Sequence, residues 1–438
     1  MRLRMRTHWI RNAMLAGAAW LAMVAPDARA ASIFLVNANA GVNAREDALY
    51  GYDASTDGAY IAIAEPGGLS TSAPTVIGGA VEIWRREGAG AVRAQRIVSS
   101  EPAENGAFGM AVRLSGDWLA VSSQVPPVVS IYRRNGALWL HSQTIEIEAP
   151  GPGRMPWLVE LDGDLLVFAT FASGVLEIPL QAYRRTGDDW VVDQPITGLD
   201  TLPGDNFGAA GAIARGSDGA LRLAVGAPGR DASRGAVYVF VQDAGGWQQE
   251  QRLQLAAAQI DDGLGFTVAI SGDSLIAGAA GFDASAQVDD SGRAAIWRRE
   301  GSGDFPWLLS ATLTLAEPRA NDRFGRSVAL PTSRLALVGA PDRDISNPPF
   351  SDYIDAGGAL RYVLDPTPLA CSPGWVADGG IGPPSLPQTD ARHGWVVAGG
   401  SLLAAGAIGA NVNAIPGAGR VSLSLDDRVF RYGHDCAD

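Results

Sequence analysis

The sequence has no lysine, only two cysteines, fewer basic than acidic residues and, beyond residue 30, no long hydrophobic run, and the last two of these features exclude classes of partner. All 34 basic residues are arginine, and 47 acidic residues outnumber them, which gives a net charge of −13. A surface of this sign repels phosphate, so we expect no nucleic-acid partner. Beyond residue 30 no apolar run approaches the roughly twenty residues that cross a bilayer, so we also expect no membrane span.

The first thirty residues have the parts of an export signal. Basic residues precede the apolar stretch Ala13–Val24, and Ala28-Arg29-Ala30 fits a small-x-small cleavage site. A membrane anchor is the alternative, but this stretch is too short to span the hydrocarbon core. We therefore predict that residues 1–30 are a cleaved signal peptide and that the protein is secreted or periplasmic.

The chain has only two cysteines, Cys371 and Cys436. An even count in an exported chain favours a disulfide, with two buried free thiols as the alternative. On the loop-entropy model a bond closing this loop contributes about 4 kcal/mol. We predict a disulfide between Cys371 and Cys436 that ties the last repeat to the end of the chain.

One unit recurs about seven times along the sequence. Its clearest copy contains Phe207-Gly208, Leu223–Pro228, Gly235–Phe240 and Trp247, in that order. The 54 glycines and 26 prolines are scattered between short apolar runs and are not gathered in a linker. This pattern predicts one continuous array over residues 31–438. The expected units are approximately 45–105, 106–151, 152–204, 205–261, 262–321, 322–372 and 373–438.

Each unit holds four short runs of β-branched, aliphatic and aromatic residues separated by turn residues, which predicts four antiparallel strands and little helix. The second run is rich in small residues, so we place it near a crowded central axis. The glycine of its Gly-Ala-Pro ending lets backbones approach, and the proline ends the strand.

Tryptophan recurs in the fourth run, where a large ring would fill the wedge between diverging units. A ring of exposed tryptophans that stacks on sugars is the alternative. The arginine pairs before this run are expected to form a solvated outer rim. The tryptophans are Trp139, Trp190, Trp247 and Trp307, and the pairs are Arg85-Arg86, Arg133-Arg134, Arg184-Arg185 and Arg298-Arg299.

These motifs together resemble the FG-GAP repeat of integrin α-subunit propellers and of many bacterial exported proteins. The motifs are Phe-Gly before the first strand, Gly-Asp before the second, Gly-Ala-Pro at its end and Gly-Ala-Val-Tyr-Val-Phe in the third. The resemblance is strong over residues 205–365 and partial over 45–204 and 373–430. It implies an all-β fold, a single seven-bladed β-propeller around a central channel.

The calcium loop that this resemblance would imply is missing from the expected turns. Turns such as Ser115-Gly116-Asp117 are too short to supply enough oxygen ligands. The nearest approach is the segment that contains Asp53 and Asp57, yet Ile61 stands where the last carboxylate is expected. We predict no metal and no cofactor, with a degenerate Asp53/Asp57 calcium loop as the alternative.

Two devices are expected to close the ring, because an open propeller leaves unpaired strand edges. Ser32–Val36 precedes the first full repeat and could add a strand to the last blade. The Cys371–Cys436 disulfide is the second device.

The sequence contains no recognisable catalytic motif, so we predict no catalytic residue. Its His393 occupies the Phe position of the Phe-Gly motif and is first of all a repeat substitution. A glycosidase needs only two carboxylates at the right separation, which sequence does not reveal.

The leading hypothesis is an exported, noncatalytic and monomeric scaffold whose loops bind an extracellular protein or glycan. The alternatives are a propeller-type polysaccharide hydrolase or lyase, and a structural envelope protein. Clustered carboxylates at one end of the channel would favour an enzyme, and an aromatic face would favour binding.

Overall fold

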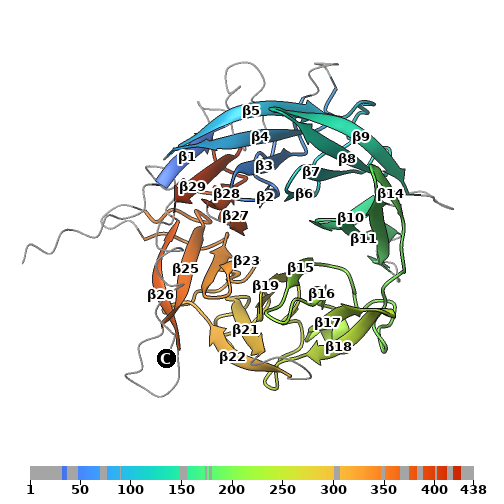
Figure 1. Cartoon of the computed structure of the whole chain (residues 1–438). Helices are drawn as coiled ribbons and strands as arrows, with labels where there is room; N and C mark the ends of the chain where they lie inside the picture. Colours follow the sequence, from blue (N-terminus) through green and yellow to red (C-terminus); the bar gives the residue numbers. More distant parts are fainter. Residues whose placement is uncertain are drawn as a thin grey trace, which may run out of the picture.

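The computed structural model describes residues 32–36, 48–69, 76–88, 90–147, 155–172, 175–176, 180–299, 306–346, 351–365, 374–381, 388–399, 402–411 and 418–425. Its strands form seven antiparallel sheets in a ring around a central axis (Figure 1). The predicted all-β, seven-bladed propeller is confirmed. Among these residues the one helix is the single turn α1 (Arg230–Ser233), and no helix is long and apolar enough to cross a membrane.

Each blade is a meander whose first strand lies nearest the axis and whose last strand lies at the rim (Figure 1). The first blade is β2 (Ala54–Thr56), β3 (Tyr60–Glu65), β4 (Ala80–Glu87) and β5 (Gly90–Val98). The second is β6 (Val112–Ser115), β7 (Trp118–Ser123), β8 (Val128–Asn135) and β9 (Leu138–Glu146). The third is β10 (Met155–Asp162), β11 (Leu165–Ala172), β13 (Gln181–Thr186) and β14 (Asp189–Val192), with β12 (Val175–Leu176) paired to β11.

The remaining blades follow the same plan. The fourth is β15 (Gly211–Arg215), β16 (Leu221–Ala227), β17 (Ala236–Asp243) and β18 (Gly246–Leu253). The fifth is β19 (Thr267–Ser271), β20 (Ser274–Ala279), β21 (Arg293–Arg299) and β22 (Trp307–Leu313). The sixth is β23 (Ser327–Thr332), β24 (Leu335–Ala340), β25 (Gly358–Asp365) and β26 (Gly374–Ile381). The seventh is β27 (His393–Gly399), β28 (Leu402–Ala407), β29 (Arg420–Leu425) and β1 (Ser32–Val36).

The sixth blade is longer than expected from sequence. The expected boundary at residue 372 gave Gly374–Ile381 to the seventh blade, but β26 pairs with β25 and is the outer strand of the sixth. Trp375 explains the difference, because it stands opposite Leu364 in the place that the recurrent tryptophans occupy in other blades.

The N-terminal strand closes the ring. β1 pairs antiparallel with β29, with Ser32 opposite Ser424 and Val36 opposite Arg420. This confirms that Ser32–Val36 adds a strand to the last blade. The second predicted closing device is the Cys371–Cys436 disulfide, and both cysteines lie outside the described residues. The predicted signal peptide at 1–30 also lies outside them.

The hydrophobic core lies between the blades. Seven clusters of buried side chains each combine residues of two neighbouring blades, including the pair formed by the seventh and the first. The Phe-Gly position supplies a fully buried residue to these interfaces. Its occupants are Tyr50, Phe108, Phe207, Leu264, Phe324 and His393.

Glycines let the blades approach through their backbones. A Cβ on Gly226 of the Gly-Ala-Pro segment would lie 1.9 Å from the carbonyl oxygen of Gly265, which belongs to the Phe-Gly position of the next blade. The same contact recurs between Gly278 and Gly325, also at 1.9 Å. Only hydrogen fits there, so the predicted role of this glycine is confirmed.

The recurrent tryptophans pack between blades, as predicted. Trp139, Trp190, Trp247 and Trp307 are 1%, 2%, 6% and 2% exposed, which leaves no face free for a sugar. A glutamine of the preceding blade binds the backbone of each, an arrangement we call the Gln–Trp clamp. The pairs are Gln95–Trp139, Gln143–Trp190, Gln194–Trp247 and Gln251–Trp307.

The arginine pairs form a solvated rim only in part. Arg85 and Arg133 are exposed, as expected. The second arginine of three pairs instead binds the aspartate of a Gly-Asp turn, as in Arg134–Asp117. Arg299 is 3% exposed and lies 3.0 Å from Asp218, so its predicted solvation is wrong.

Candidate functional site

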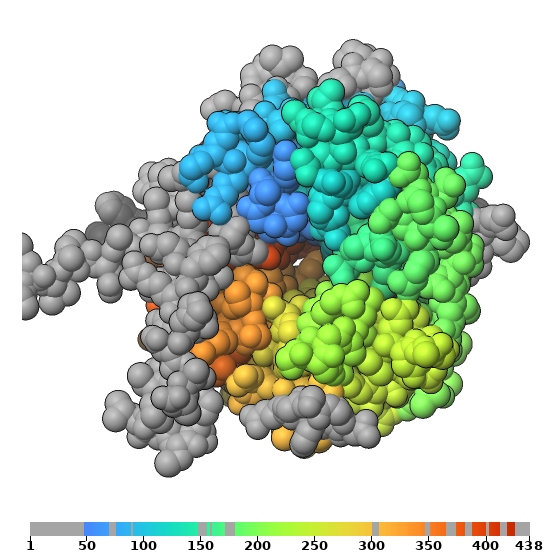
Figure 2. Space-filling view, viewed as in Figure 1, coloured from blue at the N-terminus to red at the C-terminus, as the bar shows by residue number. Residues whose placement is uncertain are grey.

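The candidate functional site is the central channel. It has a volume of about 560 Å³ and is lined by the first strands of the seven blades. Figure 2 shows it opening at the centre of the ring. We expected the second run of each repeat beside the axis, but the first strand lies there. The small residues of the second strand serve contacts between blades instead.

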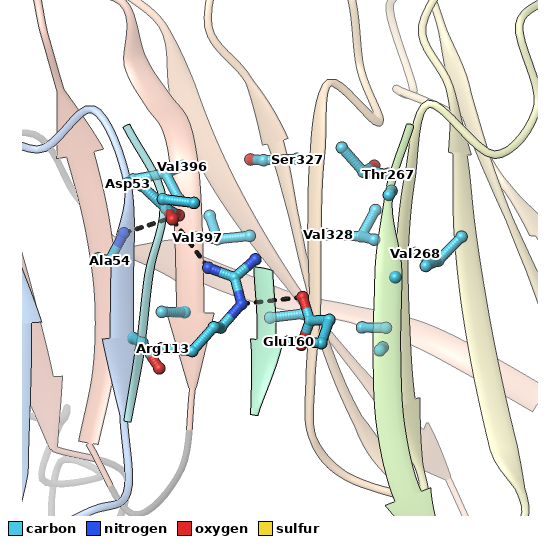
Figure 3. A pocket seen from close by; sticks show the side chains of 18 of the residues that line it. Asp53, Ala54, Arg113, Glu160, Thr267, Val268, Ser327, Val328, Val396 and Val397 are labelled. Atoms are coloured by element: carbon cyan, nitrogen blue, oxygen red, sulfur yellow. Dashed lines mark hydrogen bonds and ion pairs between the residues drawn. The ribbon is translucent and has the colours of Figure 1, made fainter. Parts of the chain in front are cut away.

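One ion-paired triad lies on the channel wall, where Arg113 stands between two carboxylates (Figure 3). Its Nε donates to Glu160 Oε1 at 2.8 Å, and its Nη1 donates to Asp53 Oδ2 at 2.8 Å. Asp53 also accepts hydrogen bonds from the backbone N–H groups of Ala54 and Val112, each at 2.9 Å. The triad therefore connects the first three blades along the channel wall.

Burial shifts the proton affinities in this triad. It raises the pKa of Glu160 to about 7, and the attraction of Arg113 offsets only part of that effect. Burial opposes the charge on Arg113, but Glu160 and Asp53 outweigh it and raise the Arg113 pKa. Glu160 is thus a carboxyl that titrates near neutral pH inside the channel.

The residue after each Phe-Gly position lines the same end of the channel, because all first strands run in the same direction. We call this end the mouth. Trp157 of β10 also lines it and donates from Nε1 to the Ala209 carbonyl oxygen at 3.3 Å. The residues after the motif are Tyr52, Met110, Ala209, Phe266, Arg326 and Trp395.

Aromatic rings dominate the mouth, and one cation lies among them. The Cζ atom of Arg326 lies 4.5 Å from the ring centroid of Phe266 and 4.4 Å from that of Trp395. Tyr52 follows, with its ring centroid 6.2 Å from that of Trp395. Phe266 and Trp157 remain 39% and 41% exposed, so part of this aromatic surface meets solvent.

Arg326 has no counter-ion within the described part of the chain, where its side chain forms no hydrogen bond or ion pair. The nearby Asp342 carboxylate is shared by Arg323 at 3.1 Å and Arg392 at 3.3 Å. Burial lowers the pKa of Arg326. The mouth therefore presents a partly desolvated guanidinium held by π faces alone.

The residues considered as a degenerate calcium loop already have partners. Asp53 belongs to the triad, and Asp57 Oδ1 accepts from the backbone N–H groups of Ala59 and Tyr60. Among the described residues no group of three or more His, Cys, Asp or Glu side chains could hold a metal ion.

His393 is fully buried, and Gly357 forms a parallel bridge to it. Corresponding bridges join Gly79 to Phe108 and Gly292 to Phe324, so the reading of His393 as a repeat substitution is confirmed. Burial lowers its pKa to about 4. The ring is therefore neutral at physiological pH and has a packing role.

Sequence reasoning missed both the mouth and one copy of the motif. Tyr50-Gly51 is the Phe-Gly position of the first blade, since Tyr50 is fully buried and forms the corresponding bridge to Gly419. Aligning the copies on this position and inspecting the next residue would have brought Phe266, Arg326 and Trp395 together.

The fold defines the class of protein, a seven-bladed β-propeller. Residues 307–352 match the family model described as FG-GAP repeat, which confirms the resemblance. The comparison with curated proteins finds no match. Among solved structures, the chain is similar to the β-propeller domain of Cps50 (Swd1) from Myceliophteria thermophila. The identity is 13%, the alignment covers 84% of this chain and 93% of that chain, and the TM-score is 0.48.

Proposed function

We propose that this protein is an exported, noncatalytic scaffold that binds a protein or glycan ligand at or outside the cell surface through the mouth of its channel. The observation that supports this most is the partly exposed aromatic surface of the mouth, with Phe266 and Trp157 about two-fifths exposed. Concave sites lined by aromatic groups with a few polar groups are typical ligand sites. A rigid ring of blades would hold these side chains in place before binding.

The direct test is a binding array of glycans and extracellular proteins, probed with the folded chain. We expect Trp157→Ala and Phe266→Ala to abolish or strongly weaken each specific signal. Leu140→Ala is the matched control, because Leu140 is 48% exposed but lies on the outer strand β9. Binding that survives both mouth substitutions would place the ligand elsewhere and contradict the proposal.

Export is part of the proposal and rests on residues 1–30. Expression of the whole chain in a bacterial host, followed by N-terminal sequencing of the exported protein, should give Ala31 as the first residue. A retained residue 1 in the exported fraction would count against a cleaved signal.

A polysaccharide hydrolase or lyase is the second candidate, because Glu160 has a pKa of about 7 within the channel. A carboxyl of this kind can act as a general acid at neutral pH. Turnover in a broad glycosidase and lyase assay that Glu160→Gln abolishes would favour this enzyme. If neither binding nor turnover is found, a structural envelope role remains.

A further inference from the structure

We infer that Arg326 at the mouth receives the carboxylate of a uronic acid residue, so that the scaffold recognises an acidic glycan. This inference rests on the proposed function, because it names the ligand class of the same mouth. It follows from the lack of a counter-ion for Arg326 among the described residues, from the two aromatic rings beside its guanidinium and from the other residues that line the channel.

Arg326 is half-buried, and the charge argument starts from the partners of other arginines that are buried or half-buried. Arg113, Arg222 and Arg293 each bind at least one carboxylate. A desolvated cation without such a partner is costly, so proteins usually pair it. Arg326 lies on the channel lining without such a partner among the described residues, although the chain is strongly acidic, with 47 Asp and Glu. A ligand anion would supply the missing charge.

The shape argument uses the two rings beside the guanidinium. The Phe266 and Trp395 ring centroids lie 4.5 and 4.4 Å from the Arg326 Cζ atom, and the N–H donors lie in the plane of the guanidinium. A planar carboxylate can accept two parallel hydrogen bonds in that plane. A carboxylate therefore fits these donors.

The rest of the lining suits a sugar ring. Trp157 and Tyr52 can pack against the apolar C–H face of a pyranose. Thr267 and Ser327 donate to backbone carbonyls at 3.1 and 2.8 Å, which leaves their oxygen lone pairs to accept from ligand hydroxyls. The channel volume of about 560 Å³ falls within the range of small-ligand sites.

Among the described residues Arg326 is the one arginine at the mouth, so we expect a ligand with one carboxylate there. The net charge of −13 repels a long polyanion from most of the surface. A short oligosaccharide or a chain end with one carboxylate at the mouth meets less repulsion. We therefore expect recognition of a uronic acid unit near an end rather than of a uniformly charged polymer.

The test is a titration of the folded chain with an aldobiouronic acid, a disaccharide that carries one uronic carboxylate, monitored by calorimetry and tryptophan fluorescence. Its methyl ester and a neutral disaccharide of equal size are titrated in parallel. We expect the free acid to bind about tenfold or more tightly than either, because both lack the charge-assisted hydrogen bonds. Equal binding of acid and ester would overturn the inference.

Three variants connect the binding to the guanidinium. We expect Arg326→Gln to weaken binding of the acid by about tenfold or more, and Arg326→Lys to weaken it less. Arg85→Gln is the matched control, because Arg85 is exposed on the outer rim and should leave the affinity unchanged. The unfolding midpoint of Arg326→Gln should not fall below that of the wild type by more than a degree or two, since no ion pair is lost.

The other outcomes separate this inference from the proposed function. A glutamate-rich peptide that binds with the same dependence on Arg326, while the uronate does not, would replace the glycan by a protein partner and overturn the inference. Array binding that Trp157→Ala abolishes but Arg326→Gln does not would also overturn it, while leaving the mouth as the ligand site. Binding insensitive to both substitutions would contradict the proposed function as well.

Discussion

Removing one Gln–Trp clamp should destabilise the propeller by a predictable amount. Gln251 Nε2 donates to the Trp307 carbonyl oxygen at 3.1 Å, and the Trp307 N–H donates to Gln251 Oε1 at 2.8 Å. Each of two such bonds contributes about 1 kcal/mol net, so Gln251→Ala should lower the free energy of unfolding by about 2 kcal/mol. Urea denaturation with linear extrapolation measures this change.

The matched control is Gln248→Ala on the same strand. Gln248 is exposed, and among the described residues its side chain makes no hydrogen bond, so the free energy of unfolding should change by less than about 0.5 kcal/mol. Hydrogen exchange gives a second readout, because the Trp307 amide should exchange faster only in Gln251→Ala. An unchanged exchange rate, or equal stability losses in the two variants, would refute the clamp as a stabilising contact between blades.

Four further predictions follow from the packing, the channel and the chain ends. Gly226→Ala should lower the free energy of unfolding by about 3 kcal/mol or prevent folding, whereas Gly374→Ala, with no atom within 4 Å of its Cβ, should be neutral in the same urea titration. Because the pKa of Glu160 is raised from 4.5 to about 7, the free energy of unfolding should fall by up to about 3 kcal/mol as pH rises through that range. Glu160→Gln should therefore flatten the curve of urea midpoint against pH, and a curve as steep as that of the wild type would contradict this. Ala311 stands opposite Ile296 in the fifth blade as the clamp residue Gln251 stands opposite Val239 in the fourth. Ala311→Gln should therefore add a clamp to the next blade and raise the free energy of unfolding by about 1 kcal/mol, and a loss of stability would show that the clamp needs more than this residue. Cys436→Ser should lower the unfolding temperature under oxidising conditions, and an unchanged midpoint with two titratable thiols in the native protein would count against the disulfide.

Most of the architecture was predictable because each blade repeats the same local pattern. The Phe-Gly, Gly-Ala-Pro and tryptophan positions all mark contacts between neighbouring blades, and these contacts recur at similar spacing along the chain. Ser32–Val36 was recognisable as a closing strand because it is an apolar run that no complete repeat includes. Where the pattern weakens, as at Gly374–Ile381, the expected boundary was misplaced by one strand.

The arrangement around the axis was harder to predict. The first and second runs of each repeat are both apolar, so composition did not show which one lines the channel. Small residues in the second run suit a crowded axis or a close contact between blades equally well, and the structure shows the second case at Gly226. The distinction depends on the position of the sheet in the ring, which no single repeat contains.

The mouth was missed because its residues come from different blades. Phe266, Arg326 and Trp395 belong to three consecutive blades, and each alone looks like an ordinary deviation in a repeat. Glu160 was missed for a related reason, since its unusual pKa arises from burial beside Arg113 of the preceding blade. A site formed by side chains of several blades can be predicted only after the repeats have been placed next to one another in the ring.

The pairing of β1 with β29 also affects how the molecule folds. Ser32 can find Ser424 only after the whole array between them has been synthesised, and contacts so distant in sequence form slowly. Until then β29 keeps an unpaired edge, which is a site for aggregation. A chain exported N-terminus first would deliver β1 earliest and need it last, so the seventh blade should be the final part of the protein to become resistant to proteases.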